Sequence, residues 1–280
     1  MSGNYDFARC VRILSMNTNL LGKLKEFIGE TVLFPSYSVR KKLSFRYLRG
    51  CGLEIGALHN PLEVPPGVTV TYVDYATREE NIKKFPLIEE SRIVATDYVA
   101  DGCELAGIAA ASQDFVVANH VLEHSANPLQ TILNWHRVLK RNGILFITVP
   151  NGEKSFDYGR EITKIEHMVD DYELVRSGDE ARFKEKNRTH YREFVEISIP
   201  NLHRVQRNLK TYSTESERNA YIDKLARESS DDAHFHVFTK PSFTDFLDYV
   251  IANYAVNFSI LEATPSRGGS EFVVILEKMD

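Results

Sequence analysis

Cysteine is scarce in this 280-residue chain, which contains only three. Cys10, Cys51 and Cys103 lie far apart, form no CxxC pair and are odd in number. The pattern therefore indicates neither a disulfide framework nor a zinc knuckle. Few, dispersed cysteines are typical of a reducing compartment, and we predict that the protein is cytoplasmic.

Long apolar runs are missing as well. No stretch approaches the roughly 20 apolar residues of a membrane-spanning helix, and the N-terminus lacks the basic and apolar pattern of a signal peptide. The net charge of −5 gives no broad positive surface, so nucleic acid is not an expected partner. A hydrophobic share of 43% with 26% charged residues is typical of a folded globular chain.

The hydrophobic pattern divides the chain into four segments. Residues 1–48 carry apolar residues at roughly helical spacing, which predicts an N-terminal helical arm that Pro35 interrupts. Residues 49–150 alternate short apolar runs with helical segments and predict a parallel α/β sheet. Residues 151–236 are polar without a strand pattern, and we expect a helical insertion that closes over the substrate. Residues 237–280 return to the sheet.

Seven strands and two long helices are predicted in the sheet domain. The strands are expected over 52–56, 68–74, 92–96, 114–119, 144–149, 256–263 and 271–276, and the helices over 128–140 and 240–254. The turn Ser266–Ser270 is typical of a hairpin, so the last strand should run antiparallel to the rest. About a dozen residues, three of them proline, separate the first two strands, and no crossover helix is expected there.

Residues suited to a nucleotide-like ligand follow successive strands. Ligands of open α/β sheets bind beyond the carboxyl ends of the strands. Gly56 after the first strand allows close backbone approach, and Asp74 at the end of the second suits two ribose hydroxyls. Asp101, after the third, suits an exocyclic amine. Each acid alone is typical of a helix cap or a solvated loop, but all three residues in register at successive strand ends favour a binding site.

The ordered motifs LEIG, YVD, ADG, DFVVANHVLEH and GILFITVPN resemble those of class I S-adenosylmethionine-dependent methyltransferases. The resemblance covers roughly residues 50–152. It implies a Rossmann-like, seven-stranded, mostly parallel sheet with an antiparallel last strand, and S-adenosylmethionine as the cofactor across the first four strand ends. The implied cofactor-binding residues are Glu54, Gly56, Ala57, Leu58, Asn60, Asp74, Tyr75, Asp101, Gly102, Asn119 and His120.

The loop GALHNP departs from the glycine-rich loop usual in that family. It resembles a subgroup associated with polysaccharide and glycan biosynthesis. A nicotinamide-dependent oxidoreductase is an alternative, because Gly50, Gly52 and Gly56 nearly repeat the dinucleotide pattern. The third glycine is one residue late, however, and the helix N-terminus that binds a pyrophosphate is missing. A non-catalytic binding module on the same sheet is a further alternative.

Histidines and a charged group in the insertion are the candidates for chemistry. Methyl transfer to a hydroxyl needs a general base, and His236 is the first candidate. His234 should face the same side if the segment is extended. Arg160, Thr163 and His167 have the spacing of one helix face, which could hold a polyhydroxylated substrate. The full set of catalytic candidates is His236, His234, His124, Asp157, Arg160 and His167. Structural histidine pairs and a solvated ionic helix face are the alternatives for these residues.

The overall expectation is O-methylation of a small polar or glycan-like acceptor. A basic, aromatic stretch over 188–207 would also suit a nucleotide-linked or phosphorylated acceptor, although a solvated helical face explains it equally well. His120, Glu123, His124, His234 and His236 include metal-ligand types, but their spacing matches no known metal pattern and no metal is expected. The sequence is compatible with a monomer or a homodimer.

Overall fold

The computed structural model describes residues 35–205, 210–228 and 233–280. Most of the predicted N-terminal arm lies outside the described residues. Its last part forms helix α4, described over Pro35–Tyr47. The predicted interruption at Pro35 concerns residues outside the described ranges and stays a prediction.

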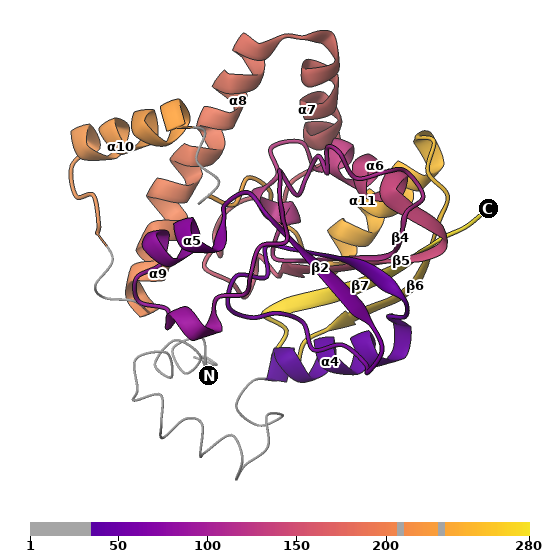
Figure 1. The fold of residues 1–280 in the computed structure, drawn as a ribbon. Coiled ribbons are helices and arrows are strands. Elements are labelled where there is room, and N and C mark those ends of the chain that lie inside the picture. Colours follow the sequence, from indigo (N-terminus) through magenta and orange to yellow (C-terminus); the bar gives the residue numbers. More distant parts are fainter. Residues whose placement is uncertain (1–34, 206–209, 229–232) are drawn as a thin grey trace, which may run out of the picture.

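Seven strands form one sheet in the order β3-β2-β1-β4-β5-β7-β6 (Figure 1). The strands are β1 (Cys51–Ile55), β2 (Thr69–Asp74), β3 (Tyr98–Val99), β4 (Gln113–Asn119), β5 (Leu139–Pro150), β6 (Phe258–Pro265) and β7 (Glu271–Lys278). The pairs from β3 to β5 are parallel, whereas β7 runs antiparallel to both β5 and β6. The predicted Rossmann-like sheet with an antiparallel last strand is confirmed.

Helices cover both faces of the sheet. Alternate residues of a strand point to opposite faces, so Val116 and Ala118 of β4 join one core while Phe115 and Val117 join the other. On the first face the sheet packs against α6 (Pro128–Val138) and α11 (Lys240–Asn253), and on the second against α4 (Figure 1). Helix α11 ends one residue before the predicted boundary.

Two predicted boundaries in the sheet domain were wrong. No strand forms over 92–96; a short helical turn, η2 (Glu90–Arg92), stands there instead, and β3 begins at Tyr98. The Arg78 side chain donates to the carbonyls of Glu90 and Ile93, which ties the segment to helix α5 (Arg78–Lys84) rather than to the sheet. The helix predicted over 128–140 ends at Val138, because residues 139–140 already belong to β5.

The insertion is helical, as predicted, and carries a small core of its own. Its elements are α7 (Ile165–Ser177), α8 (Glu180–Glu193), η4 (Phe194–Ser198), α9 (Ile199–Val205) and α10 (Glu215–Glu228). Tyr191, Phe194, Ile222, Leu225 and Phe235 are buried against one another. In Figure 1, α7 and α8 project away from the sheet. None of the helices in the described ranges is long and apolar enough to span a membrane.

Replacing Gly52 with alanine should destabilise the sheet. A β-carbon at Gly52 of β1 would lie 2.3 Å from the backbone carbonyl oxygen of Phe115 and 2.5 Å from the aromatic ring of Phe115. That oxygen belongs to the neighbouring strand β4, so it cannot move aside without disturbing the pairing. We expect Gly52→Ala to lower the free energy of unfolding by about 2 kcal/mol, measured by urea denaturation. Thr69→Ala, at the exposed start of β2, is the control and should change it by less than about 0.5 kcal/mol. Equal effects of the two variants would contradict this packing argument.

Candidate functional site

The carboxyl ends of four neighbouring strands bring the predicted cofactor residues to one edge of the sheet. Ile55 of β1 pairs with Val73 of β2 and with Ala118 of β4. Gly56, Asp74 and Asn119 therefore follow adjacent strands at the same level. Asp74 pairs with Val99 of β3, and the Asp101–Gly102 turn begins just beyond it. Which of these residues contact the cofactor stays a prediction.

Glu54 supports the first loop from below. Its side chain is buried (1% exposed), and both carboxylate oxygens accept from the Leu62 backbone N–H at 2.9 and 3.1 Å. Burial raises the pKa of Glu54 to about 7, although the bonds from Leu62 and Asn119 oppose the rise. Within the loop, Gly56 and Leu58 have φ angles of 65° and 45°, in the left-handed region that glycine adopts without strain.

The same loop takes the place of the first crossover helix. No helix lies between β1 and β2, as predicted, and the Asn60 backbone N–H donates to the Ala57 carbonyl at 2.9 Å to form a tight turn. The Val94 backbone N–H donates to the Leu58 carbonyl at 2.9 Å and joins the loop to the segment before β3. Because this helix is missing, the backbone of the loop faces the strand ends, and Glu54 fixes the conformation of the loop.

Two acidic turns follow β2 and β3. Asp74 Oδ1 accepts from the Ala76 N–H at 3.1 Å, and Asp101 Oδ1 from the Cys103 N–H at 2.7 Å. Tyr75 is 51% exposed at this edge. A β-carbon on Gly102 would lie 2.1 Å from Ile55 Cγ2, so only glycine allows this turn to pack on β1.

His120 lies between two acids at the end of β4. Its Nδ1 is 3.1 Å from Glu123 Oε1 and its Nε2 is 2.8 Å from Glu271 Oε2. The Arg40 side chain also donates to Glu271. Burial alone would lower the pKa of His120, but the two carboxylates outweigh it and raise the pKa to about 9. Burial likewise would raise the pKa of Glu271, and Arg40 and His120 lower it to about 2. The Arg40 guanidinium also lies 2.7 Å from His120 Nε2 and opposes the rise in the pKa of His120.

His234 and Asp157 form a buried pair beside this network. His234 Nδ1 is 2.6 Å from Asp157 Oδ2, and its Nε2 is 4.0 Å from Glu123 Oε1. The His234 ring lies 4.6 Å from the ring of His124 and 4.5 Å from that of Phe156, centroid to centroid. Burial would raise the pKa of Asp157, but His234 and Arg160 lower it to about 2. Glu123 therefore links the strand-end histidine to the insertion.

Arg160 does not lie on a helix, so the predicted helical face of Arg160, Thr163 and His167 was wrong. Helix α7 begins only at Ile165. The buried Arg160 guanidinium makes five hydrogen bonds, to Asp157, twice to Glu193, and to the carbonyls of His234 and Phe235. These use all five of its N–H donors, so none is left for a substrate. The Thr163 hydroxyl accepts from the Val237 backbone N–H at 2.9 Å.

His236 and His167 meet in a different cluster. His236 is 1% exposed and its Nε2 lies 3.7 Å from Asp171 Oδ2. His167 Nε2 lies 3.5 Å from the same oxygen and 3.1 Å from His190 Nε2. The expectation that His234 and His236 work as a pair on one side is not what the structure shows, since the two side chains enter separate clusters.

The sequence reasoning missed several partners of these residues. Arg40 and Glu271 are 231 positions apart and no local pattern joins them. Glu193 and His190 lie on α8, which carries no motif. Asp171 is different, because the sequence already placed it with His167 among the polar residues after the fifth strand, and a spacing of four residues on a helix puts both on one face.

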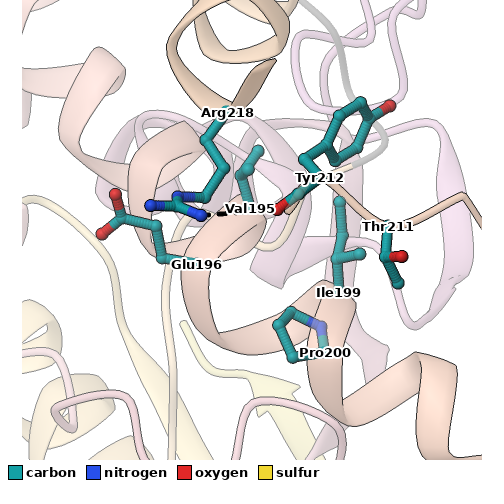
Figure 2. Close-up of a pocket in the computed structure, with 7 residues that line it drawn as sticks. All are labelled: Val195, Glu196, Ile199, Pro200, Thr211, Tyr212 and Arg218. Atoms are coloured by element: carbon teal, nitrogen blue, oxygen red, sulfur yellow. Dashed lines mark hydrogen bonds between the residues drawn. The ribbon is translucent and has the colours of Figure 1, made fainter. Parts of the chain in front are cut away.

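The insertion also contains a cavity of about 410 Å³ away from the strand ends (Figure 2). Its lining residues are Val195, Glu196, Ile199, Pro200, Thr211, Tyr212 and Arg218. Arg218 donates to the Tyr212 carbonyl at 3.4 Å and so closes one wall (Figure 2). On the same helical turn, Ser198 donates to Asp157 at 2.8 Å. A hydrogen bond thus joins the helical segment that lines the cavity to Asp157.

The family comparison agrees with this geometry. Residues 49–147 match the family model of a methyltransferase domain. This part of the chain is therefore similar to a methyltransferase domain. The matched residues include β1 to β4 and most of β5, with the edge that carries Gly56, Asp74 and Asn119. The enzyme is a methyltransferase, and its cofactor is S-adenosylmethionine.

Solved structures share the fold at low sequence identity. A protein from Rhodobacter sphaeroides described as a putative Zn-dependent alcohol dehydrogenase covers 99% of this chain and 100% of its own, with a TM-score of 0.50 and 13% identity. A putative S-adenosylmethionine-dependent methyltransferase from Listeria monocytogenes covers 88% and 97%, with a TM-score of 0.47 and 12% identity. Identities this low show the fold alone. No protein with a curated description matches the chain.

The His120 network predicts a pH-dependent stability. The pKa of His120 in the folded protein is about 9, above the ordinary value of 6.5. The contribution of His120 to the stability of the fold is therefore fully present below about pH 6.5 and is lost as the pH rises through 9. We expect the melting temperature of the wild type to fall more steeply between pH 7 and about 9.5 than that of His120→Gln, measured by scanning calorimetry. His136→Gln is the control: its pKa is lowered by burial, so the imidazole is neutral across this window. Parallel curves for the wild type and His120→Gln would refute the assignment.

Proposed function

We propose that this methyltransferase transfers the methyl group of S-adenosylmethionine to a hydroxyl oxygen of a small polar, glycan-like acceptor. The observation that supports the proposal is the His234–Asp157 pair next to the strand-end network. Such a pair suits the removal of a proton from a hydroxyl, which a carboxylate acceptor would not need.

The strand-end residues fit the cofactor by the chemistry of their donors and acceptors. Asp74 ends β2 beside Gly56, where a carboxylate accepts from ribose hydroxyls. The Asp101–Gly102 turn would accept from the adenine amine. Asn119 and His120 lie at the end of β4, on the side of the sulfonium. The bound cofactor supplies the activated methyl group, and these residues orient it.

His234 is the general base in this proposal. Asp157 accepts a hydrogen bond from the Nδ1–H group of His234, so the lone pair of the ring is on Nε2. Nε2 takes the proton of the acceptor hydroxyl, and the Asp157 carboxylate stabilises the imidazolium that forms. Phe156, whose ring packs at a tilt against the same imidazole, excludes water from one side. Positioning of the two reactants supplies the rest of the rate.

His236 was the first candidate for this role, and its surroundings favour His234 instead. His236 is almost completely buried and its nearest polar groups are Asp171, His190 and His167. His234 lies next to Glu123 and His124, which follow β4 directly. We therefore assign the proton transfer to His234 and leave His236 out of the chemistry.

The acceptor is proposed to be an uncharged polyol rather than a phosphorylated compound. Arg188 of the predicted basic stretch is already paired with Asp223, and Lys186 just before the stretch is paired with Asp170 and Asp171. Glu123 and Asp157 make the site itself acidic, which suits hydroxyl groups and disfavours a phosphate. The glycan-related loop GALHNP agrees with this class of acceptor.

An oxidoreductase remains the second candidate, because the Rhodobacter sphaeroides protein of similar fold is described as a dehydrogenase. The absence of a helix between β1 and β2 weighs against it, since a dinucleotide pyrophosphate binds at the N-terminus of that helix. Calorimetric titration separates the two: S-adenosylhomocysteine should bind and NAD should not.

Asp74 should contribute strongly to cofactor affinity. Asp74→Ala removes the charged acceptor for two hydroxyl donors, and such bonds are worth about 1.5–3 kcal/mol. We expect S-adenosylhomocysteine to bind roughly 10- to 100-fold more weakly in isothermal titration calorimetry. Asp248→Asn, on the exposed face of α11, removes one negative charge elsewhere and should leave the affinity unchanged. Unaltered binding by Asp74→Ala would remove this residue from the cofactor site.

His234 should be needed for turnover and not for cofactor binding. His234→Asn keeps a donor to Asp157 and removes Nε2, so we expect kcat to fall about 10²- to 10⁴-fold while S-adenosylhomocysteine affinity changes less than about 3-fold. The assay is transfer of a labelled methyl group to a panel of sugars, nucleotide sugars, amines and carboxylic acids. His203→Ala, on α9, is the control. Transfer to amines or acids alone, or a rate that survives His234→Asn, would overturn the proposal.

A further inference from the structure

A buried group of three histidines and one aspartate connects the insertion to the sheet domain. His167 and Asp171 lie on α7, His190 lies on α8, and His236 lies in the extended segment that leads into α11. One ligand-type atom from each of the four residues lies within 4.8 Å of all the others. Asp171 and His236 are 0% and 1% exposed, and His190 is 5% exposed.

Three of the separations between these atoms are close to the edge of a metal coordination tetrahedron. Zinc binds imidazole nitrogen and carboxylate oxygen at about 2.0–2.1 Å, which places neighbouring ligands of a tetrahedron about 3.3–3.4 Å apart. His167 Nε2 is 3.1 Å from His190 Nε2 and 3.5 Å from Asp171 Oδ2. His236 Nε2 is 3.7 Å from the same oxygen. Side chains that pack for hydrophobic reasons do not direct four donor atoms at one point.

The same atoms lack other partners among the described residues. Neither ring nitrogen of His236 has a hydrogen bond, and Asp171 Oδ2 has none either. Leaving a buried polar group unpaired costs about 1–3 kcal/mol, and more for a charged group.

We propose that His167, Asp171, His190 and His236 bind one zinc ion. Three imidazoles and a carboxylate form the nitrogen-and-oxygen ligand set that zinc accepts. Lys186 Nζ lies 2.8 Å from Asp171 Oδ1, so one carboxylate oxygen is held by the lysine while the other points at the histidines. Such an outer partner fixes the orientation of a metal ligand.

The site is structural rather than catalytic. All four coordination positions are filled by the protein, whereas a catalytic zinc keeps one position for water or substrate. The ligands come from two helices of the insertion and from the segment that also carries His234. The ion would therefore fix α7 and α8 against that segment, and with them the position of the proposed base.

The first experiment measures metal content. The full-length protein is incubated with zinc, separated from free metal by gel filtration and analysed by mass spectrometry of the elements. We expect one zinc per wild-type chain, loss of that zinc in His190→Ala and in Asp171→Ala, and retention in His203→Ala and His59→Ala. Far-UV circular dichroism and S-adenosylhomocysteine binding verify that the variants are folded. A wild type without zinc, or zinc retained by both ligand variants, would overturn the proposal.

A second measurement needs no variant. A chelator should lower the melting temperature of the wild type by at least about 5 °C, and added zinc should restore it. Cobalt in place of zinc should give the intense visible absorption of a tetrahedral site. An unchanged melting temperature together with the pale spectrum of six-coordinate cobalt would show that the four residues form a metal-free hydrogen-bonded cluster, contrary to the proposal.

Discussion

The buried guanidinium of Arg160 is the interaction on which the arrangement of the site depends. It joins the acids Asp157 and Glu193 to the backbone carbonyls of His234 and Phe235, and its side chain has no exposed surface. A buried charge of this kind is tolerated because every donor is used. Removing it would leave Asp157 buried with one cation fewer, which typically costs about 3–5 kcal/mol. Arg160 therefore sets the path of the segment that carries both histidines.

The environment of that segment explains why the predicted orientation of His234 and His236 was wrong. Alternation between two faces identifies the inward side of a strand only when the other side faces water. All residues from Ala233 to Phe238 are buried, so His234 and His236 are both covered, one by Asp157 and Glu123 and the other by Asp171 and His190. The residue types favoured chemistry at this place, and that assignment stays a prediction. The different surroundings of His234 and His236 depend on contacts with residues more than 40 positions away in the sequence.

The sheet could be predicted from the sequence because its signals are local. Short β-branched runs, the Ser266–Ser270 turn and the short connection after Gly56 each determine one element, and their order determines the topology. The strand β3 was missed because two residues are too few for a hydrophobic pattern, and its position depends on where Arg78 binds the preceding turn. Likewise, Arg40 reaches Glu271 only after α4 packs on the sheet.

The insertion needs more than its own core to keep a fixed position. Its buried cluster is small and includes Phe235, which belongs to the returning segment rather than to the helices. Polar anchors therefore carry much of the attachment: Arg160 at Glu193 on α8, and the four-residue histidine cluster at α7 and α8. Both anchors end on the segment around His234. An acceptor that displaced these helices would also move the imidazole of His234, so the fit of the substrate and the position of the proposed base would be coupled.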